Sequence, residues 1–196
     1  MSEIRRVAIF CGSNPGARPE YAEGARALAR LLAQRGIGVV YGGSSVGLMA
    51  VVAESVLDEL GDIIGVIPRM LVDREVAHTS LNDLRIVDSM HERKALMAEL
   101  SDGFIALPGG IGTLEEFFEI WTWAQLGVHQ KPCGLLNVAG YFDPLLAFLD
   151  RAVEEKFVRD VHRSMVIVDS DPAALLAKFE SYEAPRVVKW VNTGTI

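Results

Sequence analysis

The sequence has no long apolar run, no block of basic residues and only two cysteines. A membrane span needs about 20 apolar residues in a row, so we expect no membrane partner. A net charge of −7 without a basic cluster argues against a general nucleic-acid binder, whose affinity depends on neutralising many phosphates. The start, MSEIRRVAIFCGSN, does not fit a secretory signal. Cys11 and Cys133 match no metal spacing, which predicts reduced, buried thiols in the cytoplasm and no bound metal.

The 196 residues alternate between short apolar runs and helix-length segments, which predicts one nucleotide-binding α/β domain over residues 1–196. Strands are expected at 5–13, 38–43, 62–68, 84–89, 102–110, 131–138 and 163–170, and helices at 20–36, 46–61, 90–101, 113–127, 141–158 and 171–181. Residues 69–83 read as a loop with room for a short helix, and 182–196 as a tail of unknown role. Runs such as VAIF and GFIAL are typical of parallel strands covered on both faces. The pattern indicates a doubly wound, Rossmann-like fold with a mostly parallel sheet and a ligand site beyond the carboxyl ends of its strands.

Three of the predicted strand ends carry small polar loops, at residues 11–14, 42–47 and 108–113. Glycine allows close approach of the backbone to a ligand, and a helix that starts there offers unpaired N–H groups to an anion. For 42–47 alone, a tight turn is an equally good explanation. Together, the three loops favour a phosphate site. The loops lack the lysine of a P-loop, and CGSNPG does not fit the dinucleotide fingerprint, so neither ATP nor NAD is expected and no cofactor is predicted.

The third loop runs into Thr113-Leu114-Glu115-Glu116, which has two readings. The four residues fit a capping box, with Thr113 at the N-cap and Glu116 closing it. A phosphate bound at the preceding glycines would compete for the same N–H groups and free Glu116, one turn further along, to lie beside a sugar. A fixed carboxylate there would stabilise the positive charge that develops when an N-glycosidic bond breaks. The ligand that satisfies both demands is a nucleoside 5′-monophosphate.

The segment SMHERKALM supplies the expected partner of Glu116. Met90, Arg93 and Met97 share one helix face, and an arginine among apolar residues needs a partner, either Glu116 or the substrate. A surface arginine whose stem lies along the apolar face is the alternative. Lys94 is expected in solvent unless the phosphate lies on its side of the helix. Ser89 and Glu92 fit a second capping box, and His78 and His91 match no metal spacing.

The helix FFEIWTWAQLG is apolar nearly all round, which implies burial on several sides. Core packing is the default explanation, and a subunit interface is the second. We predict a homodimer.

Taken together, PGGIGTLEE, SMHERKALM and GGSSVGLM closely resemble the cytokinin riboside 5′-monophosphate phosphoribohydrolases, the Lonely guy family, whose members were long mislabelled lysine decarboxylases. The resemblance covers residues 5–180. It implies a Rossmann-like dimer that hydrolyses a cytokinin riboside monophosphate or AMP to free base and ribose 5-phosphate. In this sequence the family's catalytic pair falls on Arg93 and Glu116, its phosphate and ribose contacts on 110–113, and a glutamate beside the base on Glu75. Ser44 and Ala50 replace glycines that the family's second loop often has.

The predicted site comprises catalytic Arg93 and Glu116 and the substrate-binding residues Ser13, Gly43, Glu75, Met90, Lys94, Gly109, Gly110, Ile111, Gly112, Thr113 and Glu115. Two other functions remain open. The first is a nucleotide sensor or carrier that uses the cradle without chemistry. The second is a decarboxylase, which needs a pyridoxal-bearing lysine in an apolar site, a setting that the sequence indicates for neither Lys94 nor Lys131.

Overall fold

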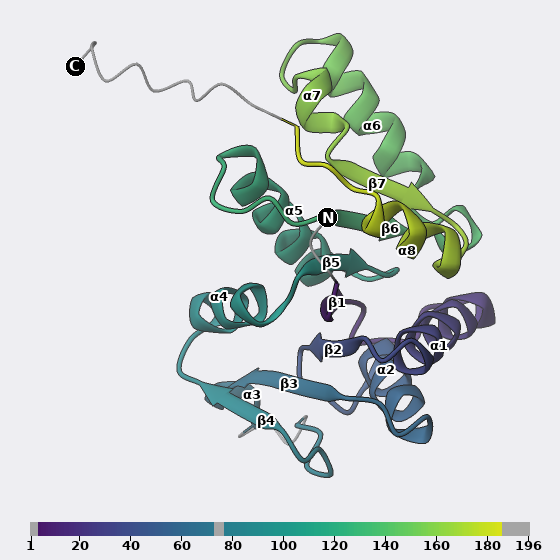
Figure 1. Ribbon diagram of the computed structural model, residues 1–196, viewed down its shortest axis with the longest axis vertical. Coiled ribbons are helices and arrows are strands. Elements are labelled where there is room, and N and C mark those ends of the chain that lie inside the picture. Colours follow the sequence, from purple (N-terminus) through teal and green to yellow (C-terminus); the bar gives the residue numbers. More distant parts are fainter. Residues whose placement is uncertain (1–3, 73–76, 186–196) are drawn as a thin grey trace.

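A computed structural model of the protein describes residues 4–72 and 77–185. Over these residues the chain forms one sheet of seven parallel strands in the order β4-β3-β2-β1-β5-β6-β7 (Figure 1). The strands are β1 (Arg6–Phe10), β2 (Gly38–Tyr41), β3 (Ile63–Pro68), β4 (Leu84–Val87), β5 (Gly103–Ala106), β6 (Cys133–Leu136) and β7 (Val166–Asp169). The predicted doubly wound, parallel α/β fold is confirmed.

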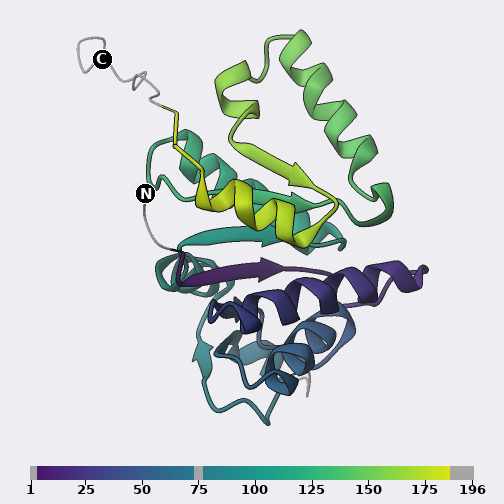
Figure 2. The ribbon, with the colours of Figure 1, turned by 45° about the vertical axis from the view of Figure 1, so that its right-hand side comes forward.

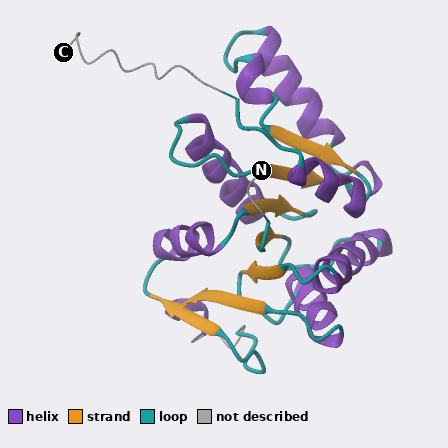
Figure 3. Cartoon of the chain, in the orientation of Figure 1, coloured by secondary structure: helices purple, strands orange, loops and turns teal. Residues whose placement is uncertain are grey.

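Three helices cover each face of the sheet (Figures 2 and 3). One layer holds α1 (Pro19–Gln34), α2 (Gly47–Asp58) and α8 (Pro172–Glu180), and the other holds α4 (Met90–Leu100), α5 (Ile111–Gln125) and α6 (Asp143–Glu154). Single-turn elements α3 (Arg69–Val72), η1 (Val138–Gly140) and α7 (Asp160–Arg163) lie in the connections. In the described part of the chain, no helix combines the length and apolar character that a membrane crossing requires.

The central strand β1 shows why residues 7–10 are all apolar. Side chains alternate along a strand, so Val7 and Ile9 join the core under α1 and α2, whereas Ala8 and Phe10 join the core under α4 and α5. All four are at most 2% exposed. A strand buried on both faces loses the polar alternation of a half-exposed one.

The order of the strands creates the site. From β1 the sheet grows toward β2 in one direction and toward β5 in the other, which makes the gap between the ends of β1 and β5 a topological switch point. The loops that follow β1, β2 and β5 contact one another there. The amide of Gly12 donates to the carbonyl of Pro108 (3.1 Å), and the amide of Leu48 donates to the carbonyl of Gly12 (3.0 Å).

The predicted elements agree with the structure apart from their ends and two omissions, the single turns η1 and α7. The short helix anticipated within 69–83 is present as α3, and Ala77 forms an antiparallel bridge with Ser44. The single turn α7 was not predicted, because four residues show no helical period. Both cysteines are buried free thiols, as predicted.

Candidate active site

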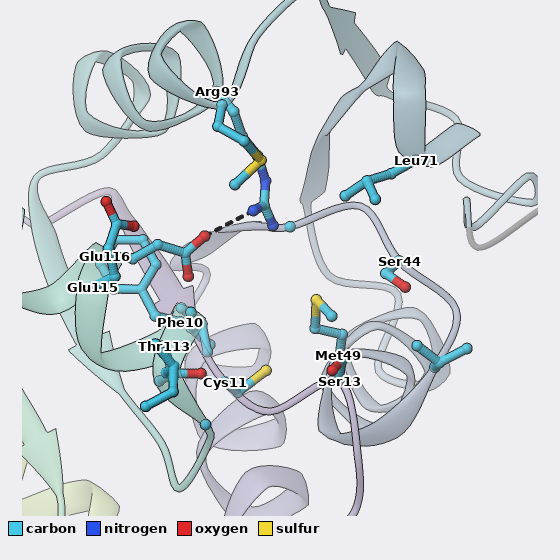
Figure 4. Close-up of a pocket in the computed structure, with 17 residues that line it drawn as sticks. Phe10, Cys11, Ser13, Ser44, Met49, Leu71, Arg93, Thr113, Glu115 and Glu116 are labelled. Atoms are coloured by element: carbon cyan, nitrogen blue, oxygen red, sulfur yellow. Dashed lines mark hydrogen bonds and ion pairs between the residues drawn. The ribbon is translucent and has the colours of Figure 1, made fainter. Parts of the chain in front are cut away.

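A pocket of about 460 Å³ opens at the carboxyl ends of β1, β2 and β5, between α4 and the start of α5 (Figure 4). Its lining comes from the three predicted loops, from α4 and α5, and from residues of β1, α2 and α3. The lining residues are Ile9, Phe10, Cys11, Ser13, Gly42, Ser44, Val46, Met49, Leu71, Met90, Arg93, Gly110, Ile111, Gly112, Thr113, Glu115 and Glu116. The volume lies within the range of small-molecule sites.

Helix α5 begins with its N–H groups open to this pocket. Its N-cap is Gly110, and no side chain of the described residues caps it. The amide of Leu114 closes the first turn on the carbonyl of Gly110, so the N–H groups before it have no partner within the helix. Gly110, Ile111 and Gly112 line the pocket, where these groups and the positive end of the helix dipole can bind an anion.

The capping-box reading of Thr113 and Glu116 is wrong. The helix begins two residues earlier than predicted, so Thr113 lies inside its first turn and is 4% exposed. Its side chain packs on Gly109 instead, since a Cβ at Gly109 would lie 2.1 Å from the Thr113 hydroxyl. Any side chain at Gly109 would therefore push the loop away from the helix. Glu116 is left free for another partner.

That partner is Arg93. Its Nη1 donates to the Glu116 carboxylate at 2.7 Å (Figure 4). Its Nε donates to the carbonyl of Val66 at 3.0 Å. Both charged residues are 7% exposed. The predicted pairing is confirmed, and the alternative of a surface arginine is wrong. Gly42 leaves room for the guanidinium, because a Cβ there would lie 1.9 Å from the Arg93 Nη2.

Burial and charge act in opposite directions on Glu116. Removal from water raises the pKa of its carboxyl above the ordinary value, and Arg93 works against that rise. Among the other charges, Glu115 and Glu119 add to the rise and Lys94 opposes it. Cys11, at the floor of the same pocket, has its thiol pKa raised, first by burial and then by Glu116. Cys11 is therefore a neutral thiol and no nucleophile at physiological pH.

The sequence predicts a solvent-exposed Lys94, but the structure buries it. It is 4% exposed and forms ion pairs with Glu115 and, at 2.8 Å, with Glu119. Burial acts to lower the pKa of Lys94, but hydrogen bonds to these two carboxylates leave it raised. Since Arg93 and Lys94 are consecutive and each holds α5, the pair fixes α4 against α5. Glu116 gains a defined position from this arrangement.

Of the predicted residues, most lie around the pocket, and a few do not. Ser13, Met90, Arg93 and the run 110–116 apart from Leu114 line it. Gly43, Lys94 and Gly109 lie outside the lining. Gly43 instead adopts a φ of +71° and lies against β3, a conformation that favours glycine. Glu75 falls outside the described residues.

Sequence reasoning missed the apolar side of the pocket. Val46, Met49, Leu71 and Met90 form it, and of these only Met90 was predicted. In Figure 4, Met49 and Leu71 lie across the opening from Glu116. Val46 lies in the second glycine loop and Met49 lies two residues after it, so their place in the sequence could have identified them as pocket residues. Leu71 had none, because only the fold brings α3 to the pocket.

Comparison with known proteins decides the family. The family model described as "Possible lysine decarboxylase" matches residues 49–179. The probable cytokinin riboside 5′-monophosphate phosphoribohydrolase LOGL5 of Oryza sativa subsp. japonica is 50% identical over 184 residues, which are 94% of this chain and 75% of that protein. The cytokinin riboside 5′-monophosphate phosphoribohydrolase LOG of the same plant is 49% identical over 181 residues, 92% of this chain and 74% of that protein. The chain belongs to this phosphoribohydrolase family.

Family members have relatives of the same fold among solved structures. The molybdenum cofactor binding protein of Rippkaea orientalis superposes with a TM-score of 0.69 at 22% identity, covering 92% of this chain and 98% of that one. At this identity the likeness concerns the fold alone. One fold can carry many functions, so the function must be argued from the site.

Proposed function

We propose that the protein hydrolyses the N-glycosidic bond of a nucleoside 5′-monophosphate, a cytokinin riboside monophosphate or AMP, to the free base and ribose 5-phosphate. The observation that carries this is the buried Arg93–Glu116 pair, which lies just after a helix N-terminus with free N–H groups. Gly112 and Glu116 are four residues apart on α5, so they share a helix face about 6 Å apart along its axis. That separation suits a sugar phosphate with its anion at Gly112 and its anomeric carbon at Glu116.

The chemistry follows from these positions. As the bond between the anomeric carbon and the base nitrogen breaks, its electron pair leaves with the base and positive charge develops on the ribose. The Glu116 carboxylate stabilises this charge, and water adds to the anomeric carbon to give ribose 5-phosphate, while the proton that the water loses neutralises the departing base. Arg93 keeps the carboxylate ionised and aimed at the pocket, and the α5 N-terminus holds the phosphate as an anchor.

The base would lie on the apolar side of the pocket, against Met49, Leu71 and Met90. Incubation with AMP and with isopentenyladenosine monophosphate, followed by chromatography of the products, tests the function. We expect free base and ribose 5-phosphate in equal amounts from at least one of them. Tight nucleotide binding with no base released would instead indicate a sensor or carrier.

Gly112→Ala tests phosphate binding without weakening the fold. Apart from its chain neighbours and the backbone of its own helix, no atom of the described residues lies within 4 Å of a Cβ placed at Gly112, so alanine fits the helix and should stabilise it by up to about 1 kcal/mol. The same methyl group would obstruct an anion at the N–H groups. We expect KM for AMP to rise roughly tenfold, which corresponds to the loss of one charge-assisted hydrogen bond. Steady-state kinetics and thermal melting measure the two effects, and an unchanged KM would contradict a phosphate at this position.

We also propose a homodimer that works in the cytoplasm, with no nucleic acid or membrane partner. Support for the dimer comes from α5, where Phe118 and Trp123 are half-buried and Leu126 and Val128 beyond them are 63% and 68% exposed. Light scattering after size exclusion should give the mass of two chains, and a monomer mass would refute the dimer. The free thiols Cys11 and Cys133 fit a reducing compartment.

A further inference from the structure

The loop that precedes α5 is held by a tyrosine from the connection between β6 and α6. The hydroxyl of Tyr141, in the connection between β6 and α6, donates to the carbonyl of Gly109 at 2.6 Å. Tyr141 is not among the residues that line the pocket. The contact joins segments 32 residues apart in sequence.

The connection that carries Tyr141 is itself well fixed. The side chain of Asn137 accepts from the amide of Phe142 and donates to Asp143, both at 2.7 Å. Ala139 and Gly140 both have positive φ, at 53° and 72°, which turns the chain sharply before Tyr141. The backbone therefore presents this side chain in one direction.

The ring of Tyr141 is held as well as its backbone. It packs edge-on against Tyr21 of α1, with ring centroids 5.5 Å apart. The Arg18 guanidinium lies 5.9 Å from the centroid of the Tyr21 ring, and Arg18 also donates to the carbonyl of Ala139. The hydroxyl of Tyr141 bonds to the loop and the ring packs on Tyr21, so the ring and the hydroxyl have separable roles.

The hydrogen bond acts on the peptide group that joins Gly109 to Gly110. A trans peptide is planar, and its C=O and N–H point in opposite directions. The described peptide bonds are all trans, so fixing the carbonyl of Gly109 also fixes the direction of the Gly110 N–H. Gly109 and Gly110 lack side chains, and a peptide between two glycines rotates easily. Gly110 is the N-cap of α5, and its N–H is one of the groups left without an intrahelical partner.

We propose that Tyr141 is a positioning residue for the substrate phosphate. Its hydroxyl fixes the Gly109–Gly110 peptide with the N–H toward the pocket, so the anion meets an already ordered loop. Ordering before binding removes an entropy cost from association and leaves the chemical step unchanged. The inference rests on the proposed function, since it assumes that a phosphate binds at the start of α5.

Tyr141→Phe tests this, because it removes the hydroxyl and keeps the ring that packs on Tyr21. We expect KM for AMP and the inhibition constant of ribose 5-phosphate to rise together, roughly three- to tenfold for the loss of one neutral hydrogen bond. The kcat should stay within roughly twofold of wild type, because the hydroxyl does not act on the bond that breaks. Tyr182→Phe is the matched control. Tyr182 follows the C-terminal end of α8 and is not among the residues that line the pocket, and both constants should keep their wild-type values.

The outcomes distinguish this inference from the proposed function. If Gly112→Ala raises both constants and Tyr141→Phe raises neither, the phosphate site stands and the role of Tyr141 is refuted. If neither variant changes KM for AMP or the inhibition constant of ribose 5-phosphate, the phosphate site at α5 is wrong and the role of Tyr141 is refuted as well. A fall in kcat and in melting temperature of Tyr141→Phe, with KM unchanged, would also overturn the proposal, since it would indicate a merely structural hydroxyl.

Discussion

Glu116→Gln is expected to lower kcat by roughly 10²- to 10⁴-fold, the range for a catalytic side chain, while nucleotide binding persists. Glutamine keeps the shape of the side chain, and its amide oxygen can still accept the hydrogen bond from Arg93 that Glu116 accepts at 2.7 Å. It has no charge with which to stabilise a cationic ribose. Single-turnover kinetics with AMP or isopentenyladenosine monophosphate measure the rate, and calorimetry measures the binding.

Glu119→Gln is the matched control. Glu119 lies on the same helix, pairs with Lys94 and is not part of the pocket lining. Its replacement removes the same charge from α5, and Lys94 keeps its ion pair with Glu115, so kcat should stay close to that of wild type. Wild-type base release by Glu116→Gln would refute the assignment of Glu116, and an equal loss in both variants would mean that the net charge of α5, and no particular carboxylate, matters.

Arg93→Met is expected to lower stability by about 3–5 kcal/mol, because it leaves the Glu116 carboxylate buried without its cation. Glu116 is 7% exposed, so water replaces the lost partner poorly. Methionine is apolar and flexible and suits a site that Met97 and Met90 flank on the same helix face. Urea unfolding at neutral pH measures the loss.

The same variant changes the pH dependence in a defined direction. Burial already raises the pKa of Glu116, and Arg93 lowers it, so removing Arg93 raises that pKa further. Because the carboxylate is the active form, the acidic limb of kcat/KM should move to higher pH. A carboxyl whose folded pKa exceeds its unfolded value favours the folded state at low pH and loses that contribution as pH rises through the folded pKa. The destabilisation of Arg93→Met should therefore be larger at pH 8 than at pH 5.

The double variant Arg93→Met/Glu116→Gln is the control for this argument. It removes the buried charge together with its partner, so it should recover part of the stability that Arg93→Met loses. If the double variant loses more free energy of unfolding than the two single variants lose together, the unpaired charge was not the cause of the loss. An acidic limb that does not move in Arg93→Met would show that another group sets it.

The helix starts show how local signals succeed and fail. Ser89 caps α4 as predicted, with its hydroxyl accepting from the amide of Glu92 at 3.1 Å. The equivalent pattern at Thr113 failed, because the chain already turns into α5 at Ile111 and Glu116 binds Arg93 instead of the backbone. A capping box describes a local preference worth about 1 kcal/mol, and a buried arginine is a stronger partner for a carboxylate.

Lys94 shows the limit of reading one helix by itself. Its sequence neighbours indicated a solvated side chain, yet α5 packs beside α4 and presents Glu115 and Glu119 to it. These carboxylates are four residues apart, so they share a helix face. Their separation from Lys94 in sequence is too large for any local rule to connect them.

The sequence alone determined the elements and the chemical types at the site: continuous apolar runs required strands covered on both faces, glycine-rich loops ended them, and an arginine and a glutamate followed in helices. Those features depend on local periodicity and on the cost of burying charge, and both can be judged from residues that are close together in the sequence. Only the tertiary structure decided that β5 lies beside β1, that α3 supplies Leu71 to the pocket and that Tyr141 holds the Gly109 carbonyl. Such contacts arise from packing between distant segments, because each depends on the position of the whole sheet and not on the residues that flank it.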